Sequence, residues 1–253
     1  FHTNMYFNNC IVDMGSGAVI YGRQGIAGTV SGIKLYKSTF KGVCQMWQGF
    51  RNGNESYFDF DQSEIDDAEY AIGLKNCLLL LRLTSSNFYR NTIGIYRGKT
   101  NDSNPFSFIY SSVLPNSLIK NCTFDGLQPI VLPTFNAQGG IPYIQKSFAG
   151  MYFSILSGGP VPYSIPFSTD PGLHNTFSNL AFGVYAINSQ IDVFNCRFIN
   201  IQPEIPHRGT AAISSLVNPG FATSRLNVGD NDQSGLALHN EFIDCQLGIW
   251  GTG

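Results

Sequence analysis

An eight-residue pattern of apolar and polar positions recurs along the chain. Each copy begins with an apolar anchor residue and ends with an apolar, a small and a β-branched residue. The closest copies span 65–72, 88–95, 148–155, 177–184 and 242–249. Stretches between the copies, such as Ile33-Lys34-Leu35 and Ile191-Asp192-Val193, alternate apolar and polar residues. Because side chains on a strand point alternately to opposite faces, this period of two predicts β-strands.

The anchors recur at a regular spacing. They are Phe40, Ile65, Phe88, Phe124, Phe148, Phe177, Phe198, Phe221 and Phe242, and they stand 25, 23, 36, 24, 29, 21, 23 and 21 residues apart. Paired-helix repeats need more than about thirty residues, and leucine-rich repeats need a motif that only 78–87 vaguely matches. The spacing therefore predicts an all-β fold, a right-handed parallel β-helix (solenoid) of about ten coils with inserted loops. Each coil is expected to add one strand to each of about three sheets.

Small and amide residues repeat within this pattern. Gly94, Gly183 and Gly248 are expected at one corner of the coil, where a tight bend has no room for a side chain. Asn121 and Asn195 each stand three residues before an anchor, and asparagines at corners can form stacked amide ladders between coils.

These motifs resemble those of a known group of proteins. Asn121-Cys-Thr-Phe124 and Asn195-Cys-Arg-Phe198, followed by Gly with Ile or Val, are similar to the β-helix repeats of the pectate-lyase-like superfamily. The low charge and the many Asn, Phe and Tyr residues resemble large secreted surface proteins of Bacteroidota. The resemblance covers nearly the whole chain and implies the fold. It does not choose among lyases, hydrolases, tailspikes and adhesins, because one fold serves many functions.

The repeat extends through a single β-helix domain, residues 1–253. Loop residues concentrate near 97–115, 133–147 and 157–172, which are the expected insertions. The chain opens at Phe1 rather than Met and neither end has a polar cap. We therefore expect a fragment of a longer chain, with further polypeptide from the same chain or from a partner subunit at both ends.

Composition narrows the class of function. Charged residues make up 13% of the chain, the net charge is −2 and the pI is about 6.1. Without a basic face there is no reason to expect nucleic-acid binding. No apolar run reaches the roughly 18 residues of a membrane span. Six scattered cysteines, at 10, 44, 77, 122, 196 and 245, are expected to be mostly buried and unpaired.

Candidate chemistry is sparse. The densest acidic stretch contains Asp59, Asp61, Asp66 and Asp67, a weak candidate for Ca²⁺ because Ca²⁺ prefers oxygen ligands, but strand alternation favours a solvated edge. We expect no metal site and no cofactor. No pair of outward carboxylates suited to sugar hydrolysis is evident, and the four histidines show no nucleophile partner. No catalytic residue is assigned.

Aromatic residues give the strongest surface signal. Tyr96, Tyr185 and Trp250 follow the β-branched residue in three copies of the pattern. If the β-branched residue points inward, these rings point outward, where they could stack on sugars or on a partner protein. Packing against loops is the alternative interpretation.

The sequence favours a noncatalytic extracellular or cell-surface protein, a rigid spacer and adhesin-like display platform that binds glycans or a partner protein. One alternative is a carbohydrate-active enzyme, a polysaccharide lyase or glycoside hydrolase of the β-helix class. Another is a subunit of a larger surface or secretion assembly.

Overall fold

The structure analysed is a computed structural model, which describes residues 4–22, 31–52, 56–74, 80–97, 118–126, 147–154, 167–170, 172–188, 190–202, 211–216, 225–229 and 238–252. Within these ranges the chain forms only β-strands and turns. All named strand pairs are parallel. No helix among the described residues is long and apolar enough to cross a lipid bilayer.

The described strands form three large sheets and one small one. Sheet A contains β1 (Met5–Asn8), β4 (Ser31–Tyr36), β7 (Ser56–Asp61), β10 (Leu80–Thr84) and β13 (Leu118–Lys120). Sheet B contains β2 (Ile11–Met14), β5 (Thr39–Gly42), β8 (Glu64–Asp66), β11 (Asn87–Tyr89), β14 (Thr123–Asp125), β16 (Asn175–Ser178), β19 (Cys196–Ile199) and β22 (Glu241–Ile243). Sheet C contains β3 (Val19–Gly22), β6 (Gly49–Asn52), β9 (Tyr70–Gly73), β12 (Ile93–Arg97), β15 (Ala149–Ser154), β17 (Phe182–Ile187), β20 (Ile213–Leu216) and β23 (Ile249–Thr252). Sheet D contains β18 (Gln190–Val193) and β21 (Arg225–Val228).

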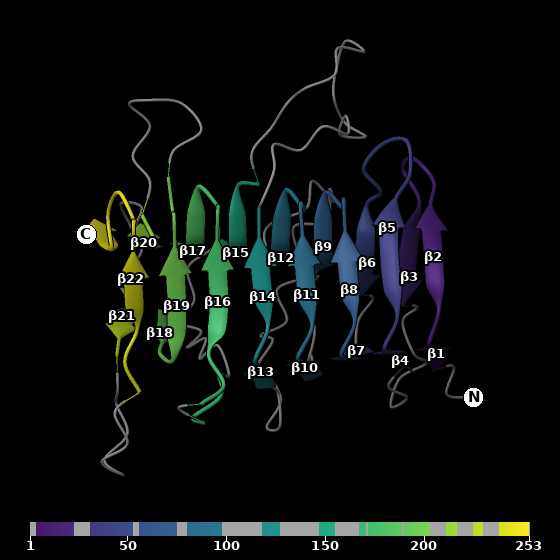
Figure 1. Cartoon of the computed structure of the whole chain (residues 1–253), viewed down its shortest axis with the longest axis horizontal. Coiled ribbons are helices and arrows are strands. Elements are labelled where there is room, and N and C mark those ends of the chain that lie inside the picture. Colours follow the sequence, from purple (N-terminus) through teal and green to yellow (C-terminus); the bar gives the residue numbers. More distant parts are fainter. Residues whose placement is uncertain are drawn as a thin grey trace.

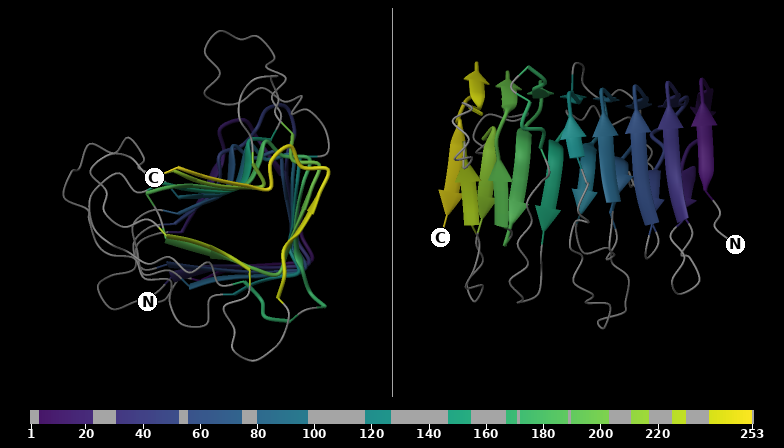
Figure 2. Two further views of the ribbon diagram at one scale, coloured as in Figure 1. Left: turned by 90° about the vertical axis from the view of Figure 1, so that its left-hand side faces the viewer. Right: turned by 90° about the horizontal axis from the view of Figure 1, so that it is seen from below.

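Successive strands visit the sheets in a repeating order. From β1 to β12 the order is A, B, C, and in later coils β18 and β21 of sheet D stand in the sequence between a strand of sheet C and one of sheet B. Seen from the end of the molecule the strands superimpose into walls around a common interior, and seen from the side they stack along its length (Figures 1 and 2). The arrangement is consistent with the predicted β-helix solenoid.

A file of phenylalanine rings fills the interior beside sheet B. We call Phe88, Phe124, Phe177, Phe198 and Phe242 the phenylalanine ladder; they occupy equivalent positions in successive strands. Neighbouring ring centroids lie 4.7, 5.0, 5.1 and 5.3 Å apart, with planes inclined by only 6–11°. This spacing follows the roughly 4.8 Å between hydrogen-bonded strands. Apart from Phe242 in the last strand of the sheet, these rings are buried.

The repeated glycines accommodate this ladder rather than a bend. Gly94 and Gly183 lie inside strands of sheet C, so the expectation of a corner is wrong for them. A Cβ atom on Gly94 would lie 2.5 Å from the Phe124 ring, and one on Gly183 would lie 2.4 Å from the Phe198 ring. The absent side chain lets each ring pack against the opposite wall. Gly248, just before β23, is in looser contact, 3.6 Å from Phe242.

Two of the nine anchors do not mark strands of sheet B. Phe124 is in direct register with Phe177, so Phe148 between them does not begin a coil there. Phe198 likewise pairs directly with Phe242, and Phe221 lies outside the described residues. The intervals of 24 and 29 residues before and after Phe148 are each close to the length of one repeat, although together they form a single long coil. The expected loops lie mostly in 98–117, 127–146 and 155–166, also outside the described residues.

A row of small polar and thiol side chains runs along the corner that leads into sheet B, and hydrogen bonds join several neighbours in the row. Its members are Cys10, Ser38, Ser63, Ser86, Cys122, Asn175, Cys196 and Asn240. The Ser63 hydroxyl donates to the carbonyl of Asp61 at 2.9 Å and accepts from the Ser38 amide at 3.2 Å. The Cys122 thiol donates in the same way to the carbonyl of Lys120 at 3.4 Å. Cysteine therefore stands in for serine at this corner.

The five described cysteines are free, as expected, but they are not mostly buried. Only Cys122 and Cys196 are buried, whereas Cys44 is exposed and Cys10 and Cys245 are intermediate. Burial raises the pKa of the Cys122 thiol to about 12, so it stays protonated and can donate its hydrogen bond. Cys77 lies outside the described residues.

Asn121 and Asn195 lie at corners, but the predicted ladder between them is wrong, because they stand two coils apart. Both residues occupy the corner position with left-handed backbone, φ 53° and 54°, which asparagine adopts more readily than most residues. Asn121 is exposed and donates to the Ser85 hydroxyl, while Asn195 donates to the carbonyls of Ser168 and Asp170. The asparagine contact between coils lies at the next corner, where Asn200 donates to Asn179 at 2.7 Å.

Candidate functional site: an aromatic file on sheet C

The three aromatic residues singled out in the sequence lie in one file across sheet C. Tyr96 is in register with Tyr152, and Tyr152 with Tyr185. The file continues through Ser214 to Trp250 in β23. The preceding residues, Ile95, Met151 and Val184, belong to the main core, so alternation along each strand directs the file to the outer face.

Four tyrosine rings stack on this outer face. We call Tyr70, Tyr96, Tyr152 and Tyr185 the tyrosine ladder. The ring centroids of successive members lie 4.4, 5.4 and 5.3 Å apart, and their planes are inclined by 16–19°. The rings come from β9, β12, β15 and β17, which are consecutive neighbours in the sheet. A continuous strip of phenol rings therefore lies across four strands of sheet C.

A small apolar cluster supports one end of the ladder. The Phe182 ring contacts Tyr185 edge-on at 4.6 Å, and the Phe148 ring lies 5.2 Å from Phe182 and 5.8 Å from Tyr185. With Ala149 and Ala181 they form a hydrophobic cluster separate from the main core. Phe148 therefore packs outside the solenoid, although its sequence pattern suggested an interior anchor.

An arginine closes the other end of the ladder. The Arg51 guanidinium lies 4.9 Å from the centroid of the Tyr70 ring and donates to the carbonyl of Tyr70 at 2.9 Å. It lies across Gly73, where a Cβ atom would come within 2.6 Å of the arginine Cδ. Burial lowers the pKa of Arg51 to about 10, which still leaves the side chain charged near neutral pH.

The ladder presents ring edges and hydroxyls rather than open ring faces. Each inner ring has its faces covered by its neighbours, so a sugar cannot stack on it as on an isolated aromatic residue. Burial raises the pKa of Tyr96 to about 12 and also raises that of Tyr185, so the phenols remain neutral hydrogen-bonding groups. Trp250, 36% exposed, is separated from Tyr185 by the buried Ser214. The Trp250 indole belongs to the same row of residues across sheet C, but it is not part of the stack of tyrosine rings.

The four aspartates considered for Ca²⁺ lie on two sheets. Asp59 and Asp61 are in β7 of sheet A, and Asp59 pairs with Arg82 at 3.2 Å and Lys34 at 3.9 Å. Asp66 ends β8 of sheet B, and Asp67 occupies the corner after it. Within the described ranges, no group of three or more metal-ligating side chains is placed to hold an ion.

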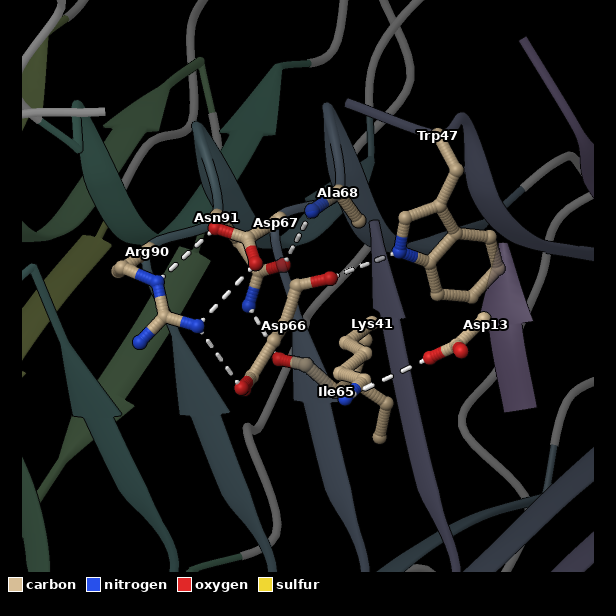
Figure 3. A network of polar contacts seen from close by, with 9 residues as sticks. All are labelled: Asp13, Lys41, Trp47, Ile65, Asp66, Asp67, Ala68, Arg90 and Asn91. Carbon is tan, nitrogen blue, oxygen red and sulfur yellow. Dashed lines mark hydrogen bonds and ion pairs between the residues drawn. The ribbon is translucent and has the colours of Figure 1, made fainter. Parts of the chain in front are cut away.

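Asp66 and Asp67 share an arginine. Arg90 contacts Asp67 at 2.9 Å and Asp66 at 3.0 Å (Figure 3). The Trp47 indole donates to the backbone carbonyl of Asp66 at 2.8 Å, and Asn91 links Ala68 to Ile65 through its side-chain amide. These contacts fix the corner after β8 and direct both carboxylates toward Arg90.

Asp66 is the most perturbed carboxyl of this group. It is 5% exposed, and burial together with the nearby carboxylate of Glu64 raises its pKa to about 7, although Arg90 opposes the shift. Its Oδ1 atom is buried and accepts no hydrogen bond. Both effects disfavour the charged form of Asp66. Sequence reasoning missed this pair, although Glu64 and Asp66 flank the inward Ile65 and must share the outer face.

Asp66 and Asp125 end equivalent strands of sheet B, with Tyr89 between them. Each is the last residue of its strand. Sequence reasoning also missed Tyr70 and Tyr152, because neither follows an anchor at the position of Tyr96.

Comparisons with protein-family models, curated proteins and solved structures found no match for this chain.

Proposed function

We propose that this chain is part of a noncatalytic, extracellular or cell-surface right-handed β-helix that serves as a rigid display platform and binds an extended glycan along sheet C. The observation that carries the proposal is the file of four stacked tyrosines with Trp250 beyond them. Its phenol groups recur at the strand spacing, so they offer repeated hydrogen bonds to a polymer lying along the solenoid. The indole of Trp250 offers a face for one sugar ring.

Stiffness is the second support. Neighbouring coils are joined by parallel strand pairs in sheets A, B and C, and one continuous core of aromatic and aliphatic residues fills the interior. Bending such a rod would open strand hydrogen bonds and the ring stacks together. A protein of this kind holds a binding strip at a fixed orientation, which suits a spacer or an adhesin.

Binding can be measured through the tryptophans. Trp47 is fully buried and Trp250 is 36% exposed, so quenching of fluorescence by iodide reports on Trp250. We expect oligosaccharides of a neutral β-glucan or of polygalacturonate to protect Trp250. Tyr185→Ala should weaken binding about tenfold, which corresponds to about 1.4 kcal/mol. Tyr36→Ala, which removes an exposed tyrosine from sheet A, is the matched control. Equal affinity of both variants, or no protection by any glycan, contradicts the proposal.

A carbohydrate-active enzyme is the second candidate. A carboxyl whose pKa is raised to about 7, as that of Asp66 is, and that lies near a second carboxyl resembles the pairs used in acid–base cleavage of glycosides. Asp66 is buried and bound to Arg90, which ranks this candidate lower. We expect no cleavage of polygalacturonate in the presence of Ca²⁺. Turnover that Asp66→Asn abolishes would reverse the ranking.

We also infer that further polypeptide, from the same chain or a partner subunit, covers the outermost described coils. Tyr6 and Ile11 of the first coil are 63% and 77% exposed, and Ile249 of the last strand is 50% exposed. Exposed apolar side chains on open strand edges promote pairing with another chain. Residues 1–253 expressed alone should self-associate. A monomer that unfolds cooperatively in sedimentation and urea experiments would contradict this inference.

A further inference from the structure

The tyrosine ladder has a chemical property that does not depend on ligand binding. Its rings are held nearly parallel, 4.4 to 5.4 Å apart between centroids, by strands that are hydrogen-bonded to one another. Each member is partly exposed, so small oxidants in solvent can reach the strip. Phenols held in this way are prealigned for coupling to one another.

We propose that the tyrosine ladder is a site of oxidative modification, at which a one-electron oxidant couples neighbouring tyrosines into dityrosine cross-links between successive coils. Tyr96 is the central residue, because its ring contacts Tyr70 on one side and Tyr152 on the other. Each cross-link would join two coils covalently and strengthen a solenoid whose coils are otherwise held by hydrogen bonds and packing.

The reaction balances with a peroxidase and hydrogen peroxide as the oxidant. Each of two phenols loses one electron and one proton and becomes a phenoxyl radical. A carbon–carbon bond then forms between ring positions next to the two oxygens, and the hydrogen on each bonded carbon moves to oxygen as the rings regain aromaticity. The two electrons and two protons reduce one hydrogen peroxide to two waters.

Proximity favours the ladder over exposed tyrosines whose rings have no stacked tyrosine neighbour. Tyr21 and Tyr36 are 50% and 41% exposed, but neither ring stacks on another tyrosine within the described part of the chain. Among the described residues they have no stacked tyrosine with which to couple, whereas ladder partners are already in contact. Well-oriented partners within one molecule reach effective concentrations on the order of 10⁵ M or more.

The test treats a dilute solution of residues 1–253 with a haem peroxidase and hydrogen peroxide, isolates the monomer and identifies cross-linked tryptic peptides by tandem mass spectrometry. Trypsin places Tyr70 in peptide 52–75, Tyr96 in 91–97, and Tyr152 with Tyr185 in 147–197. We expect peptide 91–97 joined to 52–75 and to 147–197, each pair lighter by two hydrogens. Fragment ions should place the bonds at Tyr70, Tyr96 and Tyr152.

Tyr96→Phe should abolish both joined pairs, because phenylalanine keeps the ring stack but cannot form a phenoxyl radical. Tyr36→Phe is the matched control and should leave both pairs unchanged. An unfolding midpoint like that of the unmodified sequence shows that Tyr96→Phe is folded. The proposal is overturned if the oxidised monomer lacks these pairs, if they survive in Tyr96→Phe, or if dityrosine forms only between molecules.

Discussion

Sheets B and C carry aromatic ladders on opposite faces. On sheet B the phenylalanine ladder points inward, and carboxylates such as Glu64 and Asp66 point outward. On sheet C the inward residues that precede ladder tyrosines, such as Ile95 and Val184, are aliphatic, and the tyrosine ladder points outward. Ring separations are nevertheless alike, 4.7–5.3 Å in one ladder and 4.4–5.4 Å in the other.

The similarity shows that strand spacing, not burial, sets the distance between stacked rings. Burial decides what a ladder contributes. The phenylalanine ladder removes its rings from water and stabilises the solenoid, while the tyrosine ladder keeps its edges in contact with solvent. Variants that affect one ladder more than the other test this distinction.

The largest effect is expected from truncating the buried ladder. Phe177→Ala removes a fully buried ring between Phe124 and Phe198 and leaves a cavity. The free energy of unfolding should fall by about 3–5 kcal/mol. Urea denaturation followed by circular dichroism measures this loss. A loss below about 1 kcal/mol would mean that the interior can collapse around the gap.

A smaller loss is expected where sheet C meets the phenylalanine ladder. In Gly150→Ala the new methyl group would lie 2.4 Å from the Phe177 ring, which must shift. Overpacking of this kind costs about 1–3 kcal/mol. Gly251→Ala is the control, since its Cβ atom meets nothing within 4 Å. Equal stability of the two variants would show that the ring has room to move.

The outer face of sheet B should make stability depend on pH. The pKa of Asp66 rises from 3.8 to about 7 on folding, so the folded chain binds more protons than the unfolded chain between these values. This group therefore reduces stability as the pH rises from about 4 to about 7, by on the order of 2 kcal/mol after allowance for solvent screening. Asp66→Asn should flatten this part of the profile, whereas Asp61→Asn on sheet A should not. An unchanged profile in Asp66→Asn would locate the titrating group elsewhere.

The smallest effect is expected from removing one hydroxyl of the exposed ladder. Tyr96→Phe retains the stacked ring, and the free energy of unfolding should change by less than about 0.5 kcal/mol. Thermal denaturation beside Phe177→Ala gives the contrast directly. A loss comparable to that of Phe177→Ala would show that the two ladders do not differ in the way proposed.

Much of this organisation was predictable from the sequence. Alternation gave the strands, the interval in the low twenties gave stacked coils, and the position after the β-branched residue placed Tyr96, Tyr185 and Trp250 in one file. These features depend on residues that are neighbours in the chain and on the fixed period of a strand, so they can be predicted from the sequence alone.

Only the tertiary structure decided which side chains meet across coils of unequal length. The coil from Phe124 to Phe177 is long enough to imitate two repeats, so the outward position of Phe148 could not be read from spacing. Tyr70 stacks on Tyr96 although Gly73, not Tyr70, is in register with Tyr96. The missing side chain of Gly73 leaves space for Arg51, which lies over the Tyr70 ring. The raised pKa of Asp66 depends on burial and on the nearby Glu64 carboxylate, and it is opposed by Arg90, which lies 24 residues after Asp66 in the sequence. The sequence determined the period of the solenoid, whereas contacts between coils determined which side chains interact. Those contacts depend on distances in space, and these distances cannot be calculated from residue spacing when the loops differ in length.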